Sequence, residues 1–420
     1  MRYKTGQVFI AVALSCKRKN LISHKTDRRQ NQWFVVQKAE LNVEQNRTVR
    51  KAKYLSNLNS ELWVADMNAR ERVKLALSHR EADRIPIHDS PWAATVDRWR
   101  NEGLPSGMSA ADYFNFELGS VGPDTSPMFP VEVLEEDNEY IVEKNSYGGV
   151  RKNHRDFSTT PMIIDYPCKN REDWEKIKPR LTPSDYRVDW VSSLQTFNRE
   201  HSRGLFITYN AAVGYDKMQS YVASPRLLRA VIQEPEWVKD MYWTDAKLAM
   251  DMCDRMMKGG FKFDGAFLYC DLGYRAGLFF SPRHCEDQLH PVFKELCRYF
   301  HSHEMPVFLH CCGKVKDLVP YFIEEGIDCL QPLEVKSGMD LIELKEKYGD
   351  KISFMGGIDV RLMSLEDPKP IEKEIKTKIT KAKEGGGYIY HSDHSVPKDV
   401  SFEQYKRVIA LVHKYGKYRS

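Results

Sequence analysis

One short stretch of the 420-residue sequence brings together two residue types that bind metals, His310 and Cys312, and follows them with Gly313. The apolar run from Val307 predicts a β-strand that ends here. Residues two apart on a strand share a face, so His310 and Cys312 can point to one side while Cys311 points to the other. Imidazole and thiolate are preferred zinc ligands, and a catalytic zinc needs three protein ligands and one open position. A buried histidine beside two hydrophobic cysteines is the alternative interpretation.

A second group of polar residues follows the last predicted strand, 387–391, near the C-terminus. It contains His391, Asp393 and His394. His394 can complete a zinc site with His310 and Cys312, whereas His391 and Asp393 can contact substrate. Asp393 or His391 can also orient a metal-binding side chain, because a histidine that binds a metal usually donates its second N–H to an oxygen. Exposed histidines in a polar loop are the alternative.

Polar residues also end several other predicted strands. Asp271 can act as a general base, orient a ligand or cap the next turn, and we take it as the candidate catalytic residue. Asp89, Asn210 and Gln331 end three further strands. We expect these three side chains, with His391 and Asp393, to bind substrate.

The strand ends belong to an alternation of short apolar strands and amphipathic helices that starts at Met67. Such an alternation implies a parallel sheet with helices outside it. Eight strands in series predict an α/β fold of the (β/α)₈ TIM-barrel type, with the active site at the C-terminal strand ends. The strands are expected at 85–89, 205–210, 265–271, 306–310, 328–331, 352–356 and 387–391, with a weaker eighth at 118–124.

Two regions depart from this alternation. Short extended pieces at 139–142, 149–152 and 161–165 predict a small antiparallel insertion. Residues 1–66 show no sustained hydrophobic periodicity of either the strand or the helix type. We therefore interpret them as a basic, poorly structured N-terminal extension ahead of a catalytic domain at 67–420.

Charge and cysteine content narrow the classes of function. The net charge of +4 is unevenly distributed along the chain. Residues 1–66 hold 13 Lys and Arg against 5 Asp and Glu, whereas residues 67–420, the body of the protein, hold 50 against 54. A mildly acidic body disfavours nucleic acid as a partner. The nine cysteines are an odd number spread along the chain, which is typical of a reducing compartment, and we expect the cytoplasm. No apolar run reaches the length of about 18 residues that a membrane-spanning helix needs.

With these strand ends identified, the chain resembles the uroporphyrinogen decarboxylase superfamily, which also contains zinc-dependent methylcobalamin:thiol methyltransferases. True decarboxylases carry an arginine-rich motif after the first strand, where this chain has Asp89-Ser90-Pro91-Trp92. The methyltransferase branch carries His-x-Cys and a distal Cys as zinc ligands, and here His394 stands at the distal position. The resemblance is therefore closer to the methyltransferase branch. It rests on Arg70-Glu71-Arg72, Asp83-Arg84-Ile85-Pro86, Ser281-Pro282, His310–Gly313, Gly356-Gly357-Ile358-Asp359 and Asp393-His394-Ser395-Val396-Pro397.

The resemblance implies a zinc ion on His310, Cys312 and His394 that activates an acceptor thiol for methyl transfer. The chain has no D-x-H-x-x-G corrinoid signature, so a methylcobalamin donor would arrive on a separate partner protein. Two other functions are compatible with the residues. One is a metal-independent decarboxylase of a smaller acid that uses Asp124 or Asp271. The other is a catalytically silent barrel that binds a partner.

Overall fold

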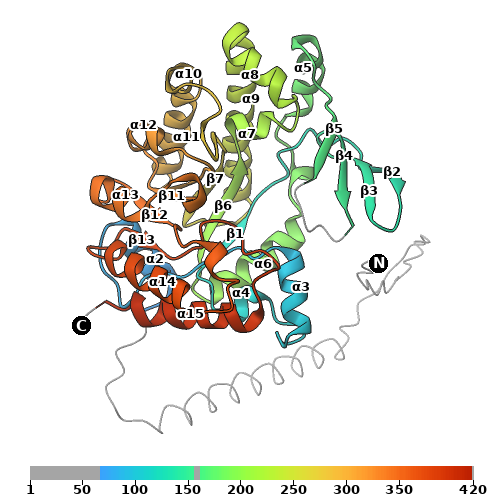
Figure 1. Ribbon diagram of the computed structural model, residues 1–420. Coiled ribbons are helices and arrows are strands. Elements are labelled where there is room, and N and C mark those ends of the chain that lie inside the picture. Colours follow the sequence, from blue (N-terminus) through green and yellow to red (C-terminus); the bar gives the residue numbers. More distant parts are fainter. Residues whose placement is uncertain (1–66, 156–160, 419–420) are drawn as a thin grey trace, which may run out of the picture. The chain divides into compact units, whose positions relative to one another are not determined.

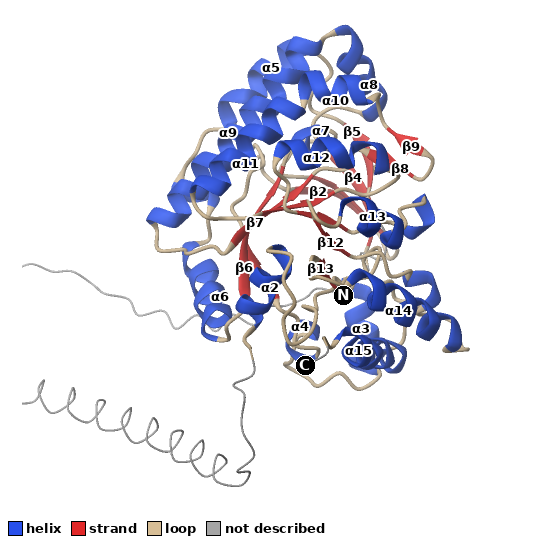
Figure 2. Ribbon diagram, turned by 90° about the vertical axis from the view of Figure 1, so that its left-hand side faces the viewer, coloured by secondary structure: helices blue, strands red, loops and turns tan. Residues whose placement is uncertain are grey.

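A curled parallel sheet forms the frame of this computed structural model, which describes residues 67–155 and 161–418. Its strand order is β1-β6-β7-β10-β11-β12-β13, and all neighbours run parallel. The strands curve around a common interior with helices outside them (Figure 2). The predicted parallel α/β arrangement is confirmed. The strands are β1 Leu118–Val121, β6 Phe206–Ala212, β7 Gly265–Tyr269, β10 Val307–His310, β11 Cys329–Gln331, β12 Ser353–Met355 and β13 Tyr388–Ile389.

The helices between the strands lie on the outside of this sheet (Figure 1). They bury one apolar face against it. In α11, for example, Val292, Leu296 and Phe300 repeat at helical spacing and are all buried. The longer helices are α2 Ala69–Leu77, α3 Ala93–Asn101, α6 Trp190–Ser202, α8 Ser224–Gln233, α9 Pro235–Lys258, α11 His290–Ser302, α13 Leu341–Tyr348, α14 Lys369–Ala382 and α15 Phe402–Gly416. The shorter ones are α4 Ala110–Tyr113, α5 Arg171–Ile177, α7 Gly214–Met218, α10 Pro282–Gln288 and α12 Val319–Glu325.

The closed barrel of eight regular strands that the sequence predicted is not confirmed, because seven of the strands form the regular parallel sheet. The weaker candidate near 118–124 is a strand, β1, but segment 85–89 joins the sheet only through an isolated parallel bridge between Ile87 and Tyr390. On its other side, the Ile87 carbonyl accepts a hydrogen bond from the Glu117 N–H at 2.9 Å. Pro86 has no N–H to donate to a strand ladder, which favours an irregular segment here. The fold is therefore a seven-stranded, TIM-barrel-like half-barrel.

An apolar cluster fills the interior of the sheet at the N-terminal side of the strands. Phe267 stacks on Phe308 with ring centroids 5.4 Å apart, and Phe206 packs edge-on against Phe308. Val73 and Ala76 of α2 belong to the same cluster. Because this end is filled by side chains, the interior can accept a ligand only at the C-terminal ends of the strands.

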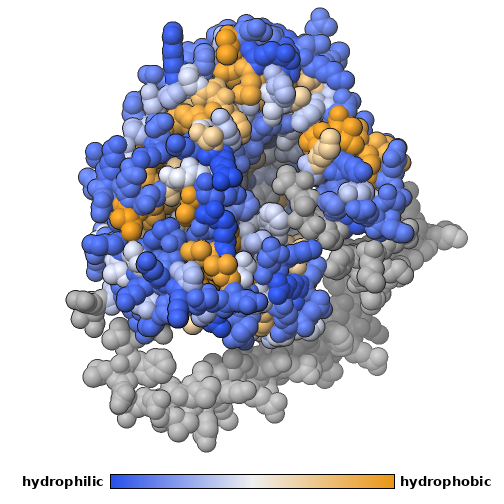
Figure 3. Space-filling model, in the orientation of Figure 1, coloured by the Kyte–Doolittle hydropathy of each residue, from blue (hydrophilic) through white to orange (hydrophobic). Residues whose placement is uncertain are grey.

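The antiparallel insertion is present and has four strands, where the sequence predicted three extended pieces. It comprises β2 Glu132–Glu136, β3 Tyr140–Lys144, β4 Val150–His154 and β5 Met162–Asp165 in that order. Strand β2 was not predicted from the sequence. Three of its five residues are glutamates and all five are exposed, so it has no alternating pattern of apolar and polar residues. Figure 3 shows exposed apolar side chains gathered over this sheet, among them Val133, Met162 and Ile164.

Residues Met67–Ser420 form one compact unit. The predicted extension, residues 1–66, lies outside the described residues. We expect a protein that begins at Met67 to stay soluble and to melt within a few degrees of the full chain, because residues 67–420 contain large buried apolar clusters of their own. Thermal unfolding of both proteins by circular dichroism measures this, and aggregation of the shorter protein would contradict it. Within the described residues, no helix is both long and apolar enough to cross a membrane.

Candidate active site

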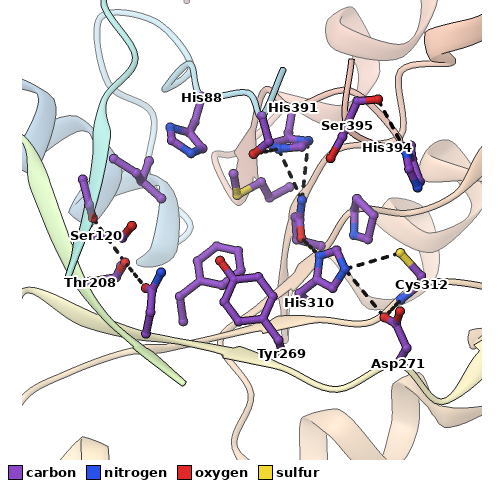
Figure 4. Close-up of a pocket in the computed structure, with 18 residues that line it drawn as sticks. His88, Ser120, Thr208, Tyr269, Asp271, His310, Cys312, His391, His394 and Ser395 are labelled. Carbon is purple, nitrogen blue, oxygen red and sulfur yellow. Dashed lines mark hydrogen bonds and ion pairs between the residues drawn. The ribbon is translucent and has the colours of Figure 1, made fainter. Parts of the chain in front are cut away.

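A cavity of about 350 Å³ lies at the C-terminal ends of the sheet strands (Figure 4). Its floor is the apolar cluster described above, since Leu118, Phe267 and Met355 belong to both. Its remaining wall is made mostly of residues with polar or aromatic side chains at several strand ends, together with one glycine and one proline. These are His88, Ser90, Gly119, Ser120, Thr208, Asn210, Tyr269, Asp271, His310, Cys312, Gln331, Pro332, His391, His394 and Ser395.

Three potential metal ligands converge at one end of this cavity. The ligand atoms of Asp271, His310 and Cys312 all lie within 4.8 Å of one another. The His310 Nε2 atom is 3.4 Å from the Cys312 Sγ and 3.6 Å from the Asp271 Oδ1. They meet because β10 pairs with β7 in a register that sets His310 beside Tyr269, two residues before Asp271.

The two neighbouring cysteines face opposite ways, as the strand alternation predicts. Cys312 lines the cavity, whereas Cys311 is buried in the main core with 2% of its surface exposed. The turn after them needs glycine, because Gly313 has a φ of +86° and a Cβ there would lie 2.2 Å from the backbone of Gly273. The Asp271 carboxylate accepts the Cys312 backbone N–H at 2.7 Å and so fixes the start of this turn.

The electrostatics of this group favour a bound cation. Burial raises the pKa of the Cys312 thiol well above its ordinary value, and the charges of Asp271 and Glu334 raise it further. A thiolate next to a carboxylate needs a positive partner, and imidazole nitrogen, thiolate sulfur and carboxylate oxygen are all zinc ligands. The donor set therefore fits zinc.

The side chain of Gln331 connects this group to a second histidine. The His310 Nδ1 atom lies 2.5 Å from the Gln331 Oε1, and the Gln331 Nε2 lies 3.3 Å from the His391 Nε2. The His391 Nδ1 lies 2.6 Å from the Ser392 carbonyl oxygen. Because an amide oxygen only accepts, His310 carries its proton on Nδ1, and its Nε2 lone pair is left for a metal.

Replacing Gln331 should therefore weaken zinc binding without removing a ligand. We expect Gln331→Leu to lower zinc affinity about 10- to 100-fold, because His310 loses the acceptor that fixes its tautomer. Gln331→Glu keeps an oxygen acceptor toward His310 and should retain most of the affinity. Competition with a chromogenic chelator measures both variants, and equal affinities in the two would contradict this role.

His394, predicted as the third zinc ligand, lines the same cavity but is not in the group of three. Its ring lies edge-on to Trp92 with centroids 6.0 Å apart. Among the described residues, the side chain that joins His310 and Cys312 is that of Asp271, the residue predicted as catalytic. The role of His394 as a ligand stays a prediction.

The five predicted substrate-binding residues divide into two sets. Asn210, Gln331 and His391 line the cavity. Asp89 lies behind it and accepts hydrogen bonds from the Tyr405 hydroxyl at 2.7 Å and the Ser392 hydroxyl at 2.5 Å.

Asp393 also lies outside the cavity wall. Its carboxylate accepts the backbone N–H groups of Val335 and Val360, each at 2.9 Å. Burial raises the pKa of Asp393. Both aspartates therefore hold the loops around the cavity and are not among the residues that line it, and the substrate contact predicted for them stays a prediction.

The cavity residues that the sequence did not identify as candidates include His88, Ser120, Thr208 and Tyr269. Thr208 and Tyr269 stand two residues before Asn210 and Asp271, so strand alternation gives each pair one face. The pattern was thus present in the sequence. His88 and Ser120 lie inside predicted strands, and their position follows from the same alternation only when the inner face of each strand is known.

Comparisons with known proteins agree with this fold. The family model described as uroporphyrinogen decarboxylase (URO-D) matches residues 157–415. A curated uroporphyrinogen decarboxylase of Mannheimia succiniciproducens is 26% identical over 150 residues, which are 35% of this chain and 39% of that protein. Another, of Vesicomyosocius okutanii, is 28% identical over 79 residues, 19% and 23% of the two chains. The matched part therefore spans well under half of these relatives.

A solved methyltransferase from Methanosarcina mazei has a similar fold. It superposes with a TM-score of 0.60 over 83% of this chain and 99% of its own, at 14% sequence identity. At this identity the likeness concerns the fold. The family match covers more than half of the 420 residues, and the cavity lies at the strand ends where the sequence motifs placed it. This chain belongs to the uroporphyrinogen decarboxylase family.

Proposed function

We propose that this protein is a methyltransferase that moves a methyl group between a corrinoid, carried by a separate partner protein, and a small thiol. The observation that carries the proposal is the convergence of His310 Nε2, Cys312 Sγ and an Asp271 oxygen within 4.8 Å at the cavity wall. The fold likeness to a methyltransferase is compatible with it.

In this proposal His310 and Cys312 hold zinc, with Asp271 or His394 as the third ligand. Zinc, when bound, would lower the pKa of the acceptor thiol so that it can act as a nucleophile at neutral pH. The chain itself orients the site: Gln331 fixes the His310 ring, and Asp271 holds the backbone of Cys312. A corrinoid is far larger than a cavity of about 350 Å³, so it would present its methyl group from the opening.

A decarboxylase is the second candidate, because the curated relatives carry that name. A porphyrinogen substrate bears many carboxylates, which proteins usually bind through arginine or lysine. Among the described residues that line the cavity, none is an arginine or a lysine. The cavity therefore favours methyl transfer over decarboxylation of a polycarboxylate.

Two assays on the purified full chain separate these functions. We expect about one zinc per chain by mass spectrometry, and zinc-dependent transfer of the methyl group from free methylcobalamin to 2-mercaptoethanol, followed by the corrinoid absorbance. Release of carbon dioxide from uroporphyrinogen by metal-free protein would instead support the decarboxylase.

A further inference from the structure

The cavity has two chemically different ends. The single carboxylate among the described residues that line it, Asp271, lies at the end that holds His310 and Cys312. Figure 4 shows His88, Ser120 and Thr208 at the opposite end. No lysine or arginine lines the cavity within the part of the chain that the structure describes. The end far from the metal ligands, which we call the far end, is thus polar but uncharged.

The hydrogen bonds at the far end leave donors for a ligand. The Thr208 hydroxyl lies 3.2 Å from the Gly119 carbonyl oxygen and 3.0 Å from the Asn210 Oδ1. Both partners are acceptors, and the hydroxyl has a single proton to donate between them. The Asn210 oxygen faces this hydroxyl, and the Asn210 NH₂ group keeps two N–H donors for a molecule in the cavity.

His88 adds a neutral ring to the same end. Its Nδ1 atom is buried and has no hydrogen-bond partner among the described residues. The ring packs against Phe116 and His391, with centroids 5.6 Å and 6.1 Å away. Burial lowers the pKa of His88 to about 3, so the ring is uncharged at neutral pH, and because its Nδ1 atom is buried it adds a neutral surface with at most its other nitrogen open to a ligand.

An apolar surface connects the two ends. Phe267 and Tyr269 lie with their ring centroids 5.0 Å apart, and Tyr269 lies 5.3 Å from the His310 ring. Leu118 and Met355 add aliphatic surface. A molecule that spans the cavity therefore meets metal ligands, then hydrocarbon, then neutral hydrogen-bonding groups.

We infer that the methyl acceptor is a thiol whose tail carries an uncharged hydrogen-bonding group, such as a hydroxyl or an amide. This inference rests on the proposed function. A sulfonate, phosphate or carboxylate on the tail would lose its hydration at the far end without meeting a cation, which is unfavourable. Lys336 lies outside the cavity wall, acts on Cys312 at the metal end, and is already paired with Glu334 at 3.2 Å. A tail ammonium would likewise find no carboxylate at the far end, whereas a hydroxyl or amide finds both donors and an acceptor.

The test uses four thiols that share a two-carbon spacer and differ in the terminal group of the tail, which is neutral in one, cationic in one and anionic in two. They are 2-mercaptoethanol, cysteamine, 3-mercaptopropionate and 2-mercaptoethanesulfonate. Each is titrated into the zinc-loaded full chain by calorimetry, and the series is repeated with longer methylene spacers so that the tail can reach the far end. We expect the neutral thiol to bind about tenfold or more tightly than the charged ones in at least one series.

Substitutions at Asn210 should change this preference in a defined direction. Asn210→Lys places a cation at the far end and should favour the anionic thiols, whereas the nearly isosteric Asn210→Asp should favour cysteamine. Asn198→Lys is the matched control, because Asn198 is exposed on α6 and should leave the order unchanged. If Asn210→Lys does not fold, judged by its melting curve, Asn210→Asp still tests the prediction.

The outcomes separate this inference from the proposed function. Tighter binding of an anionic or cationic thiol by the natural protein would overturn the inference and leave thiol activation intact. An order that does not change in either Asn210 variant would also overturn it, because the far end would then not contact the tail. Failure of every thiol to bind the zinc-loaded protein would overturn the proposed function as well.

Discussion

Replacing Cys312 with serine should remove most of the zinc from this protein, whereas replacing Cys311 with serine should not. The two residues are adjacent in the sequence, but only Cys312 lines the cavity, with its Sγ 3.4 Å from the His310 Nε2. A serine hydroxyl stays protonated near neutral pH and is a poor zinc ligand compared with thiolate. We expect at least a tenfold fall in zinc affinity for Cys312→Ser.

The Cys311→Ser variant is a control for both position and chemistry. Cys311 is buried in the main core, so this change buries a hydroxyl and should cost stability of about 1–3 kcal/mol. Its zinc content, measured by mass spectrometry after gel filtration, should match that of the natural protein. Equal zinc loss in both variants would show that folding, and not ligation, controls the metal content.

Asp271 should prove to be the third zinc ligand. Its oxygen lies within 4.8 Å of the ligand atoms of both His310 and Cys312, a group that His394 does not join. We expect Asp271→Ala to lower zinc affinity by tenfold or more, because the metal loses a directly bound ligand. His394→Ala should retain most of the zinc.

A third variant separates ligation from positioning, because Asp271 also accepts the Cys312 N–H at 2.7 Å. Asp271→Asn keeps an oxygen acceptor for this hydrogen bond, but it replaces the carboxylate with a neutral amide, which is a weaker metal ligand. If zinc falls in Asp271→Asn as in Asp271→Ala, the carboxylate is a ligand. If it falls in Asp271→Ala alone, Asp271 positions the turn. Zinc loss in His394→Ala, with retention in both Asp271 variants, would restore His394 as the third ligand.

Much of the local architecture could be read from the sequence. Short apolar runs followed by amphipathic patterns predicted the parallel sheet, and the runs ending at His310 and Gln331 are strands β10 and β11. The two-residue period of a strand also predicted that Cys312 and Cys311 face opposite sides. These features depend on the order of neighbouring residues, which is why the sequence alone specifies them.

Which strand ends meet was decided by the tertiary structure. Asp271 joins His310 because β7 is paired directly with β10, whereas His394 follows β13, which pairs with β12. Asp89 and Asp393 stand at strand ends like Asp271, yet each is used by hydrogen-bond donors of other segments. Strand order and register are long-range properties of the fold. So is the choice of which hydrogen-bond donors reach each carboxylate. No local spacing in the sequence encodes them, so the residue types were predictable and the third member of the cluster was not.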